Sequence, residues 1–291
     1  MRYYLTIDIG GTDIKYGVIT ENDELVFKAI TATRGFLGGE EIINQIKGIF
    51  NELSKEYKLE GIAISSTGGI DETSQMLTPS ICVKDYEKVN FSRDLADLNV
   101  PVSAENDVNS MALGERDLVP NHENMKCLLA MTIGTGIGGA IFINDELHRG
   151  FLFTAGEWGK MRLYDRTFEE LASTAALVSA ASMVNPRIKN GIDVFKLYDQ
   201  GDEKIIPIVN VFYDHLTTGL ANLIYILNPE HIVIGGGITN RGDQFLQEVM
   251  THLEPKLWDY INKKFSISIA KNKNDAGMIG AFKLFKSKYL K

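Results

Sequence analysis

Two glycine-rich turns, one near the start of each half of the 291-residue chain, constrain the fold most strongly. The first turn is Gly10-Gly11, and the second is the segment 134–139, which has four glycines in six residues. The β-rich apolar runs that flank both turns predict strands at 3–9, 14–19, 127–133 and 140–143. Because a strand, a glycine turn and a second strand recur in the same order, the chain has a weak internal repeat of supersecondary plan, although not of residue identity.

Helical and strand patterns alternate along the rest of the chain. Apolar residues at helical spacing, or a helix cap, predict helices at 39–57, 107–116, 169–183, 207–227, 244–260 and 276–288. Short apolar runs predict strands at 25–32, 61–65, 101–104, 231–234 and 266–270. This alternation predicts an α/β protein of two lobes, residues 1–118 and 119–275, with a central cleft between the lobes. The closing segment 276–291 is expected to pack back on the N-terminal lobe.

Charge and composition exclude several classes of protein. The net charge of −8 opposes binding to nucleic acid and to anionic membrane surfaces. No apolar run approaches the roughly 20 residues that span a bilayer, and residues 1–8 carry charge too early for a signal peptide. The two cysteines, Cys82 and Cys127, are far apart and are expected to be reduced. We therefore expect a cytoplasmic protein with neither a nucleic-acid partner nor a membrane partner.

A carboxylate followed by a glycine turn ends the first predicted strand. Glycines allow the backbone to approach a phosphate group and to point N–H groups at it, and Thr12 adds a hydroxyl donor. Asp8 suits a hydrated Mg²⁺ ion, which prefers one or two carboxylates and several waters. The candidate phosphate-binding residues of this segment are Asp8, Gly10, Gly11, Thr12, Asp13 and Lys15. A plain hairpin turn also explains the two glycines, so this segment alone does not indicate a function.

The second glycine turn is the more informative of the two. It is not a Walker A loop, because no Gly-Lys-Ser/Thr follows, and it is not the dinucleotide fingerprint, because a strand rather than a helix follows it. Four glycines exceed what a hairpin requires, and two such loops would contact a phosphate chain from both sides. The candidate phosphate-binding residues of this turn are Gly134, Thr135, Gly136 and Gly138.

The segment 105–107, Glu-Asn-Asp, lies where a predicted strand meets a predicted helix, which is where α/β folds commonly bind ligands. Asp107 at this position would accept the proton of a sugar hydroxyl, and Asn106 would hydrogen-bond a neighbouring hydroxyl. Helix capping by Asn or Asp is the common alternative, and it is compatible with catalysis.

The segment 155–161 places Glu157, Trp158 and Lys160 between glycines in a predicted loop. This combination of a carboxylate, an indole and an ammonium group indicates a binding surface. A solvated turn is the alternative interpretation.

Together these segments resemble the ROK family of bacterial sugar kinases, glucokinases and repressors, which have the two-lobe actin-like ATPase (ribonuclease H-like) fold. The resemblance covers the whole chain, and the two glycine turns are similar to the family's two phosphate loops. It implies that Asp107 is the general base. It also implies an adenosine-side motif at Gly235, Gly236 and Gly237, and sugar contacts from Gly68, Asn106, Asp107, Glu157, Lys160 and Glu169.

The chain departs from the family pattern at two places. Lys160 stands where most members have a histidine, and 161–170 contains no cysteine where members have a zinc cluster, so we expect no zinc site. Phe151 and Phe153 replace a stretch that is usually small and polar. The segment 65–71 resembles the family loop that lines the sugar and is called the predicted sugar loop. Two rings beside this loop would suit stacking on a second sugar ring or an aglycone, as in the family's β-glucoside kinases. The alternative is that both rings fill the core.

The resemblance implies an ATP- and Mg²⁺-dependent kinase that phosphorylates the 6-hydroxyl of a hexose unit, with a β-glucoside such as cellobiose as the expected acceptor. N-acetylmannosamine kinase and glucokinase are the alternative activities, and a sugar-sensing regulator is the non-enzymatic alternative. Family repressors carry a DNA-binding helix-turn-helix before the first phosphate loop, whereas this loop starts at residue 8, so direct DNA binding is not expected. A homodimer is the expected assembly.

Overall fold

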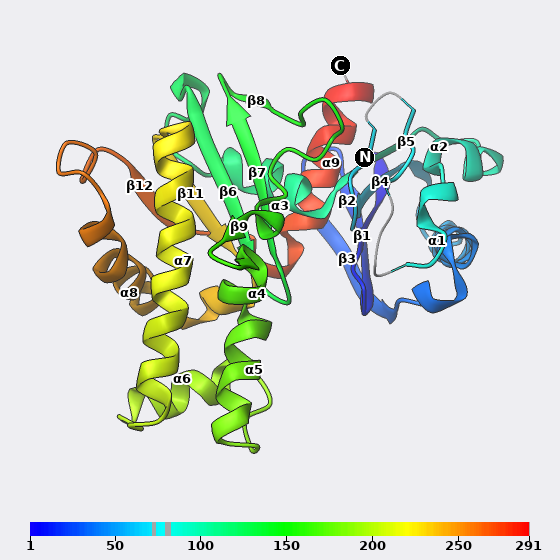
Figure 1. Ribbon diagram of the computed structural model, residues 1–291. Helices are drawn as coiled ribbons and strands as arrows, with labels where there is room; N and C mark the ends of the chain where they lie inside the picture. Colours follow the sequence, from blue (N-terminus) through cyan, green and yellow to red (C-terminus); the bar gives the residue numbers. More distant parts are fainter. Residues whose placement is uncertain (72–73, 79–82, 291) are drawn as a thin grey trace. The chain divides into compact units, whose positions relative to one another are not determined.

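The computed structural model of the protein describes residues 1–71, 74–78 and 83–290, so Cys82 lies outside the described residues. The chain forms two compact units (Figure 1). Unit 1 comprises Met1–Pro120, Gly150–Thr154 and Lys271–Lys291, and unit 2 comprises Asn121–Arg149 and Ala155–Ala270. The sequence did not predict that Gly150–Thr154 would belong to unit 1.

Unit 1 is built on a five-stranded sheet of order β3-β2-β1-β4-β5. Its strands are β1 (Tyr3–Ile9), β2 (Asp13–Thr20), β3 (Leu25–Ala32), β4 (Leu59–Ser66) and β5 (Val102–Asn106). β1 pairs with β2 in antiparallel fashion, whereas β4 is parallel to both β1 and β5. The carboxyl ends of β1, β4 and β5 therefore meet at one edge of the sheet, which brings Asp8, Ser66 and Asn106 to the same edge.

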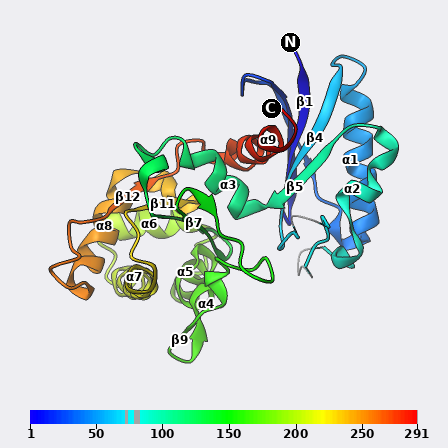
Figure 2. The same ribbon diagram turned by 90° about the horizontal axis from the view of Figure 1, so that it is seen from above.

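Helices cover both faces of the unit 1 sheet (Figure 2). They are α1 (Gly39–Leu53), α2 (Phe91–Asp94), α3 (Asp107–Arg116) and α9 (Ala276–Tyr289). The apolar stripe of α1, which includes Ile42 and Ile46, packs on one face. Phe282 and Phe285 of α9 pack with Tyr4 on the other face. Fully burying one such phenylalanine stabilises the fold by about 1.5–3 kcal/mol, which explains why the final helix is anchored on this sheet.

Unit 2 contains a second five-stranded sheet, of order β12-β11-β6-β7-β8, and a small hairpin. The sheet strands are β6 (Cys127–Ile133), β7 (Ile137–Ile143), β8 (Glu146–Leu147), β11 (His231–Gly235) and β12 (Ser266–Ile269), and the hairpin strands are β9 (Arg162–Leu163) and β10 (Arg166–Thr167). β6 is antiparallel to β7 and parallel to β11. The carboxyl ends of β6 and β11 are therefore neighbours, and a glycine segment follows each of them.

The helices of unit 2 pack with this sheet in one apolar cluster. They are α4 (Phe168–Ala172), α5 (Thr174–Val184), α6 (Gly191–Asp199), α7 (Ile205–Leu227) and α8 (Asp243–Leu253). Short 3-10 helices across both units occupy Gly35–Leu37, Tyr86–Lys88, Ala96–Leu98, His122–Asn124, Trp158–Lys160, Gly237–Arg241, Glu254–Lys256 and Lys273–Asp275. Within the described ranges, no helix combines the length and the apolar character needed to cross a bilayer.

Several predicted helix boundaries are wrong, for local reasons. The helix predicted over 169–183 is two helices, because Ser173 adopts an extended backbone conformation and its side chain caps α5 by accepting from Ala176 N. The helix predicted over 244–260 ends at Leu253, because Pro255 lacks the N–H that would continue the hydrogen-bond pattern. The short helix α6, capped by Asn190, was not predicted.

Candidate functional site

Asp8 lies near the carboxyl end of β1, between one residue from each neighbouring strand. Its Oδ1 accepts a hydrogen bond of 2.7 Å from Ser65 Oγ of β4, and its Oδ2 lies 3.2 Å from Nζ of Lys15 on β2. A Cβ atom added at Gly277 in α9 would lie 2.8 Å from the Asp8 carboxyl group. The carboxylate is thus fixed in orientation at the sheet edge, and Lys15 is its ion-pair partner.

The predicted first phosphate loop is the tight turn that joins β1 to β2. Gly10 N donates to Asp13 O over 3.0 Å, and Gly11, Thr12 and Asp13 are exposed. Thr33, which was not predicted as a site residue, stabilises the turn because its hydroxyl donates to Gly10 O over 2.7 Å. No local sequence pattern could have indicated Thr33, since it lies 23 residues from its partner.

Asn106 connects the predicted catalytic residue to the predicted sugar loop. Its Oδ1 caps α3 by accepting from Val108 N and Asn109 N over 2.9 and 3.1 Å. Its Nδ2 donates to Asp107 Oδ1 over 2.9 Å and to Gly68 O over 3.0 Å. The capping interpretation is therefore confirmed, because the oxygen caps the helix, and the nitrogen links Asp107 to the 65–71 loop. The hydrogen bond from Asn106 to a sugar hydroxyl stays a prediction.

Asp107 is the first residue of α3, where the positive end of the helix dipole favours a negative charge. Its Oδ1 accepts hydrogen bonds from Val108 N and from Asn106 Nδ2. Tyr86 is fully buried nearby, with its hydroxyl 2.6 Å from Ser66 Oγ. Burial raises the pKa of Tyr86, the hydrogen bond with Ser66 opposes that shift, and the charge of Asp107 adds to it. Tyr86 therefore stays neutral beside the carboxylate.

The segment Gly150–Thr154 lies against the predicted sugar loop of unit 1. A Cβ atom added at Gly69 would lie 2.9 Å from the carbonyl oxygen of Phe153, and Gly69 is also hydrogen-bonded to Thr78. Phe151 is 93% exposed and Leu152 is 64% exposed, whereas Phe153 is half-buried. The alternative interpretation, in which both phenylalanines fill the core, therefore does not hold for Phe151, whose ring is an exposed apolar surface.

The two glycine segments of unit 2 that are predicted to bind the nucleotide lie next to each other. Gly134 N donates to Gly136 O across the β6–β7 turn, and Thr135 is exposed at its tip. In the segment after β11, Gly236 has φ +92°, and a Cβ atom there would lie 2.3 Å from the carbonyl oxygen of Ile133. Ile133 is the last residue of β6, directly before the turn. Gly235 is buried, and Gly237 starts the 3-10 helix that ends at the buried guanidinium of Arg241.

Glu157, Lys160 and Glu169 gather in unit 2. Lys160 Nζ donates to Glu169 Oε1 over 2.5 Å, and this hydrogen bond raises the pKa of Lys160. Desolvation of the Glu157 carboxyl group raises its pKa, the Lys160 ammonium opposes that shift, and the negative charge of Glu169 adds to it. The Glu157 side chain nevertheless keeps contact with solvent. Of the three predicted sugar residues in unit 2, the structure joins two as an ion pair.

The prediction of a binding role for Trp158 is wrong. Trp158 is 5% exposed and belongs to the apolar core of unit 2. A Cβ atom added at Gly139 would lie 2.2 Å from its ring, so this glycine provides space for the indole. The excess of glycines in 134–139 is thus explained in part by packing, whereas nothing lies within 4 Å of a Cβ built at Gly134.

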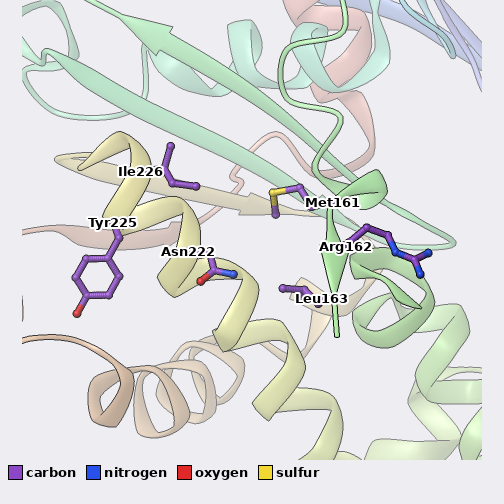
Figure 3. A pocket seen from close by; sticks show the side chains of 6 residues that line it. All are labelled: Met161, Arg162, Leu163, Asn222, Tyr225 and Ile226. Atoms are coloured by element: carbon purple, nitrogen blue, oxygen red, sulfur yellow. The ribbon is translucent and has the colours of Figure 1, made fainter. Parts of the chain in front are cut away.

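A hollow of about 430 Å³ lies elsewhere in unit 2 (Figure 3). It is lined by Met161, Arg162, Leu163, Asn222, Tyr225 and Ile226. None of the predicted site residues lines this hollow, and it is not part of the candidate site. Among the residues that the structure describes, no group of three or more His, Cys, Asp or Glu side chains is arranged to hold a metal ion.

Comparison with known proteins assigns the chain to a family. Residues 4–288 match the ROK family. A beta-glucoside kinase of Listeria monocytogenes is 34% identical over 287 residues, which cover 94% of each chain. A solved structure from the same species, a suggested N-acetylmannosamine kinase, is 31% identical with a TM-score of 0.87, covering 98% of this chain and 99% of the other.

Two further solved structures are similar over nearly the whole chain. A Streptococcus pneumoniae ROK family protein in complex with sucrose is 26% identical, with a TM-score of 0.86 and 98% of both chains covered. A Streptomyces griseus glucokinase, solved with glucose and AMPPNP, is 23% identical with a TM-score of 0.82, covering 97% of this chain and 98% of the other, and it shows the fold alone. The predicted actin-like ATPase fold is therefore confirmed. The chain belongs to the ROK family, and the predicted resemblance to its sugar kinases is confirmed with it.

Proposed function

We propose that this protein is an ATP-dependent sugar kinase that phosphorylates the 6-hydroxyl of a hexose unit, with a β-glucoside such as cellobiose as its acceptor. The observation that carries the proposal is the Asn106–Asp107 arrangement, in which one amide orients the carboxylate and contacts Gly68 of the sugar loop. A carboxylate held in this way at a helix start is suited to accept a proton from a bound hydroxyl.

In the proposed reaction, Asp107 accepts the proton of the sugar 6-hydroxyl. A bond forms between that oxygen and the γ-phosphorus, and the bond from the γ-phosphorus to the β–γ bridging oxygen breaks, so that ADP leaves. Asn106 keeps the Asp107 carboxylate in orientation through its 2.9 Å hydrogen bond. The protein takes little part in the covalent chemistry, and positioning of the two substrates supplies most of the rate enhancement.

The residues proposed to contact the nucleotide are the turn 10–13, Lys15, the turn 134–138 and the glycines 235–237. Asp8 fits a hydrated Mg²⁺, because its two described hydrogen bonds use only part of the roughly four acceptor positions of a carboxylate. When bound, Mg²⁺ would neutralise part of the phosphate charge.

Phe151 favours a β-glucoside over a single hexose. Phe151 is 93% exposed and lies two residues before Phe153, whose carbonyl oxygen lies against Gly69. The Phe151 ring offers apolar surface that glucose alone would leave exposed to water. A second sugar ring stacked on it removes that surface from water, at about 25 cal/mol per Å². Covering a few tens of Å² favours a disaccharide by about 1 kcal/mol, which is several-fold in specificity. The 34% identity to a beta-glucoside kinase supports the same choice.

A coupled ADP-release assay with glucose, N-acetylmannosamine, cellobiose and gentiobiose tests the proposal. We expect the highest kcat/KM for a β-linked disaccharide, and phosphorus NMR of the product should place the phosphate on a 6-hydroxyl. A higher kcat/KM for glucose or N-acetylmannosamine would replace the acceptor with one of those sugars. Calorimetric binding of a sugar without any ADP release would instead favour a sugar-sensing regulator.

A further inference from the structure

Glu169 lies between two turns of unit 2 that have different roles in the proposed reaction. Its Oε2 would lie 2.7 Å from a Cβ atom added at Gly136 and 2.8 Å from one added at Gly159. Its Oε1 accepts the hydrogen bond from Lys160 Nζ. The carboxylate therefore touches the β6–β7 turn, proposed to bind phosphates, and also the 3-10 turn Trp158–Lys160 that directly follows Glu157.

The backbone around Glu169 leaves little freedom for this contact to relax. A capping box between Thr167 and Glu170 fixes the start of α4, and Phe168 N donates to Met161 O over 2.7 Å. The second turn is equally confined, because a Cβ atom at Gly159 would lie 2.3 Å from Ile137 O in β7. Close-packed surroundings transmit a displacement rather than absorb it. A shift of the Glu169 carboxylate toward either turn must then displace that turn.

We propose that Lys160 and Glu169 form a positioning pair that couples sugar binding at the 157–160 turn to nucleotide binding at the 134–136 turn. This inference rests on the proposed function. Lys160 is 62% exposed and Glu169 is 27% exposed, so a ligand can reach the Lys160 ammonium without any unpacking of the unit. A sugar oxygen that accepts a hydrogen bond from the Lys160 ammonium fixes the positions of the Lys160 and Glu169 side chains. The Glu169 carboxylate then keeps a fixed position beside Gly136. The nucleotide then binds a turn that is already ordered, which gives positive coupling.

Calorimetry on the full chain tests this coupling without relying on turnover. The dissociation constant of AMPPNP is measured alone and with saturating cellobiose, and glucose serves as a second sugar probe. The coupling factor is the ratio of the two constants, and we expect at least about fivefold for the wild type. Lys160→Met and Glu169→Gln should each lower this factor to near one, whereas Lys160→Arg should largely restore it. A partly exposed ion pair adds little to stability, so these variants should remain folded.

The ratio distinguishes a positioning pair from a simple sugar contact. A simple contact weakens sugar binding equally with and without nucleotide and leaves the coupling factor unchanged. Lys256→Met, which breaks the comparable ion pair with Asp214 in the same unit, is the matched control and should keep the wild-type factor. Wild-type coupling in both Lys160→Met and Glu169→Gln, or its absence from the wild type, would overturn the inference. If the wild type binds neither sugar, the proposed function fails first and the coupling fails with it.

Discussion

Asn106 and Asp107, adjacent in sequence, are joined by a 2.9 Å hydrogen bond from the amide nitrogen to the carboxylate oxygen Oδ1. The same amide nitrogen donates to Gly68 O, and the amide oxygen caps α3. One side chain thereby contributes to the start of the helix, the position of the 65–71 loop and the orientation of the proposed base. Capping can be tested separately from the other two roles, because the amide oxygen carries the cap and the amide nitrogen carries both the Gly68 and the Asp107 contacts.

Asp107→Asn should lower kcat by about 10²–10⁴-fold, because the substituted amide cannot accept the hydroxyl proton. Binding of AMPPNP should be nearly unchanged, since no nucleotide contact is removed. Steady-state kinetics and calorimetry measure the two effects. Asp117→Asn, at the other end of α3, is the control and should keep near-wild-type kcat. A variant of Asp107 that retains most of the wild-type activity would show that another group is the base.

Replacing Asn106 separates capping from positioning. Asn106→Ser keeps a good cap and should leave the melting temperature nearly unchanged, whereas Asn106→Ala should cost about 0.5–2 kcal/mol of stability. Both variants lack the amide nitrogen that contacts Asp107 and Gly68, so both should lose about tenfold in kcat/KM, as expected for one or two lost hydrogen bonds. Full activity in the serine variant would mean that Asn106 acts only as a cap.

Phe151→Ala should lower kcat/KM for cellobiose several-fold and leave the value for glucose within about twofold, because we propose that only the disaccharide contacts the ring. Phe151→Tyr keeps the ring and should preserve the preference. The ratio of the two kcat/KM values is the measurement. Equal losses on both sugars would indicate that Phe151 supports the loop and does not contact a second ring.

On acidification, kcat/KM should fall with a midpoint above the ordinary Glu pKa of about 4.3, and we call this fall the acid limb of the pH profile. In the proposed function the ionised Glu157 accepts sugar hydrogen bonds. Desolvation raises its pKa, so the active form should be lost on acidification at a higher pH than for an ordinary Glu. Lys160→Met removes a charge that lowers this pKa and should move the limb up, whereas Glu169→Gln should move it down. A limb that neither variant moves would belong to another group.

The purified protein should contain no stoichiometric zinc. The segment 161–170 lacks cysteine, and the described parts of the chain offer no cluster of metal-ligating side chains. Metal analysis by mass spectrometry gives the zinc content, and a zinc-selective chelator should leave the melting temperature unchanged. One tightly bound zinc per chain would contradict the expectation drawn from this segment.

Much of the fold could be predicted because its signals are local. The strands on either side of the two glycine turns follow from β-rich runs next to turn residues, and the predicted strands 3–9 and 127–133 are confirmed as β1 and β6. The start of α3 at Asp107 follows from the Asn106 cap. The errors at Ser173 and Pro255 show the limit of periodicity, because a single residue ended a helix that the apolar spacing continued.

The sequence alone determined where strands, glycine turns and helix caps lie, because each depends on residues within a few positions of one another. Only the tertiary structure decided what those turns contact. Thr33 on Gly10, Phe153 against Gly69 and Glu169 against Gly136 join residues far apart in the chain. The same holds for the burial of Trp158 against Gly139 and for the exposure of Phe151. These contacts arise when separate elements pack against one another. Local sequence propensity does not determine which distant side chain will fill the space beside a given glycine.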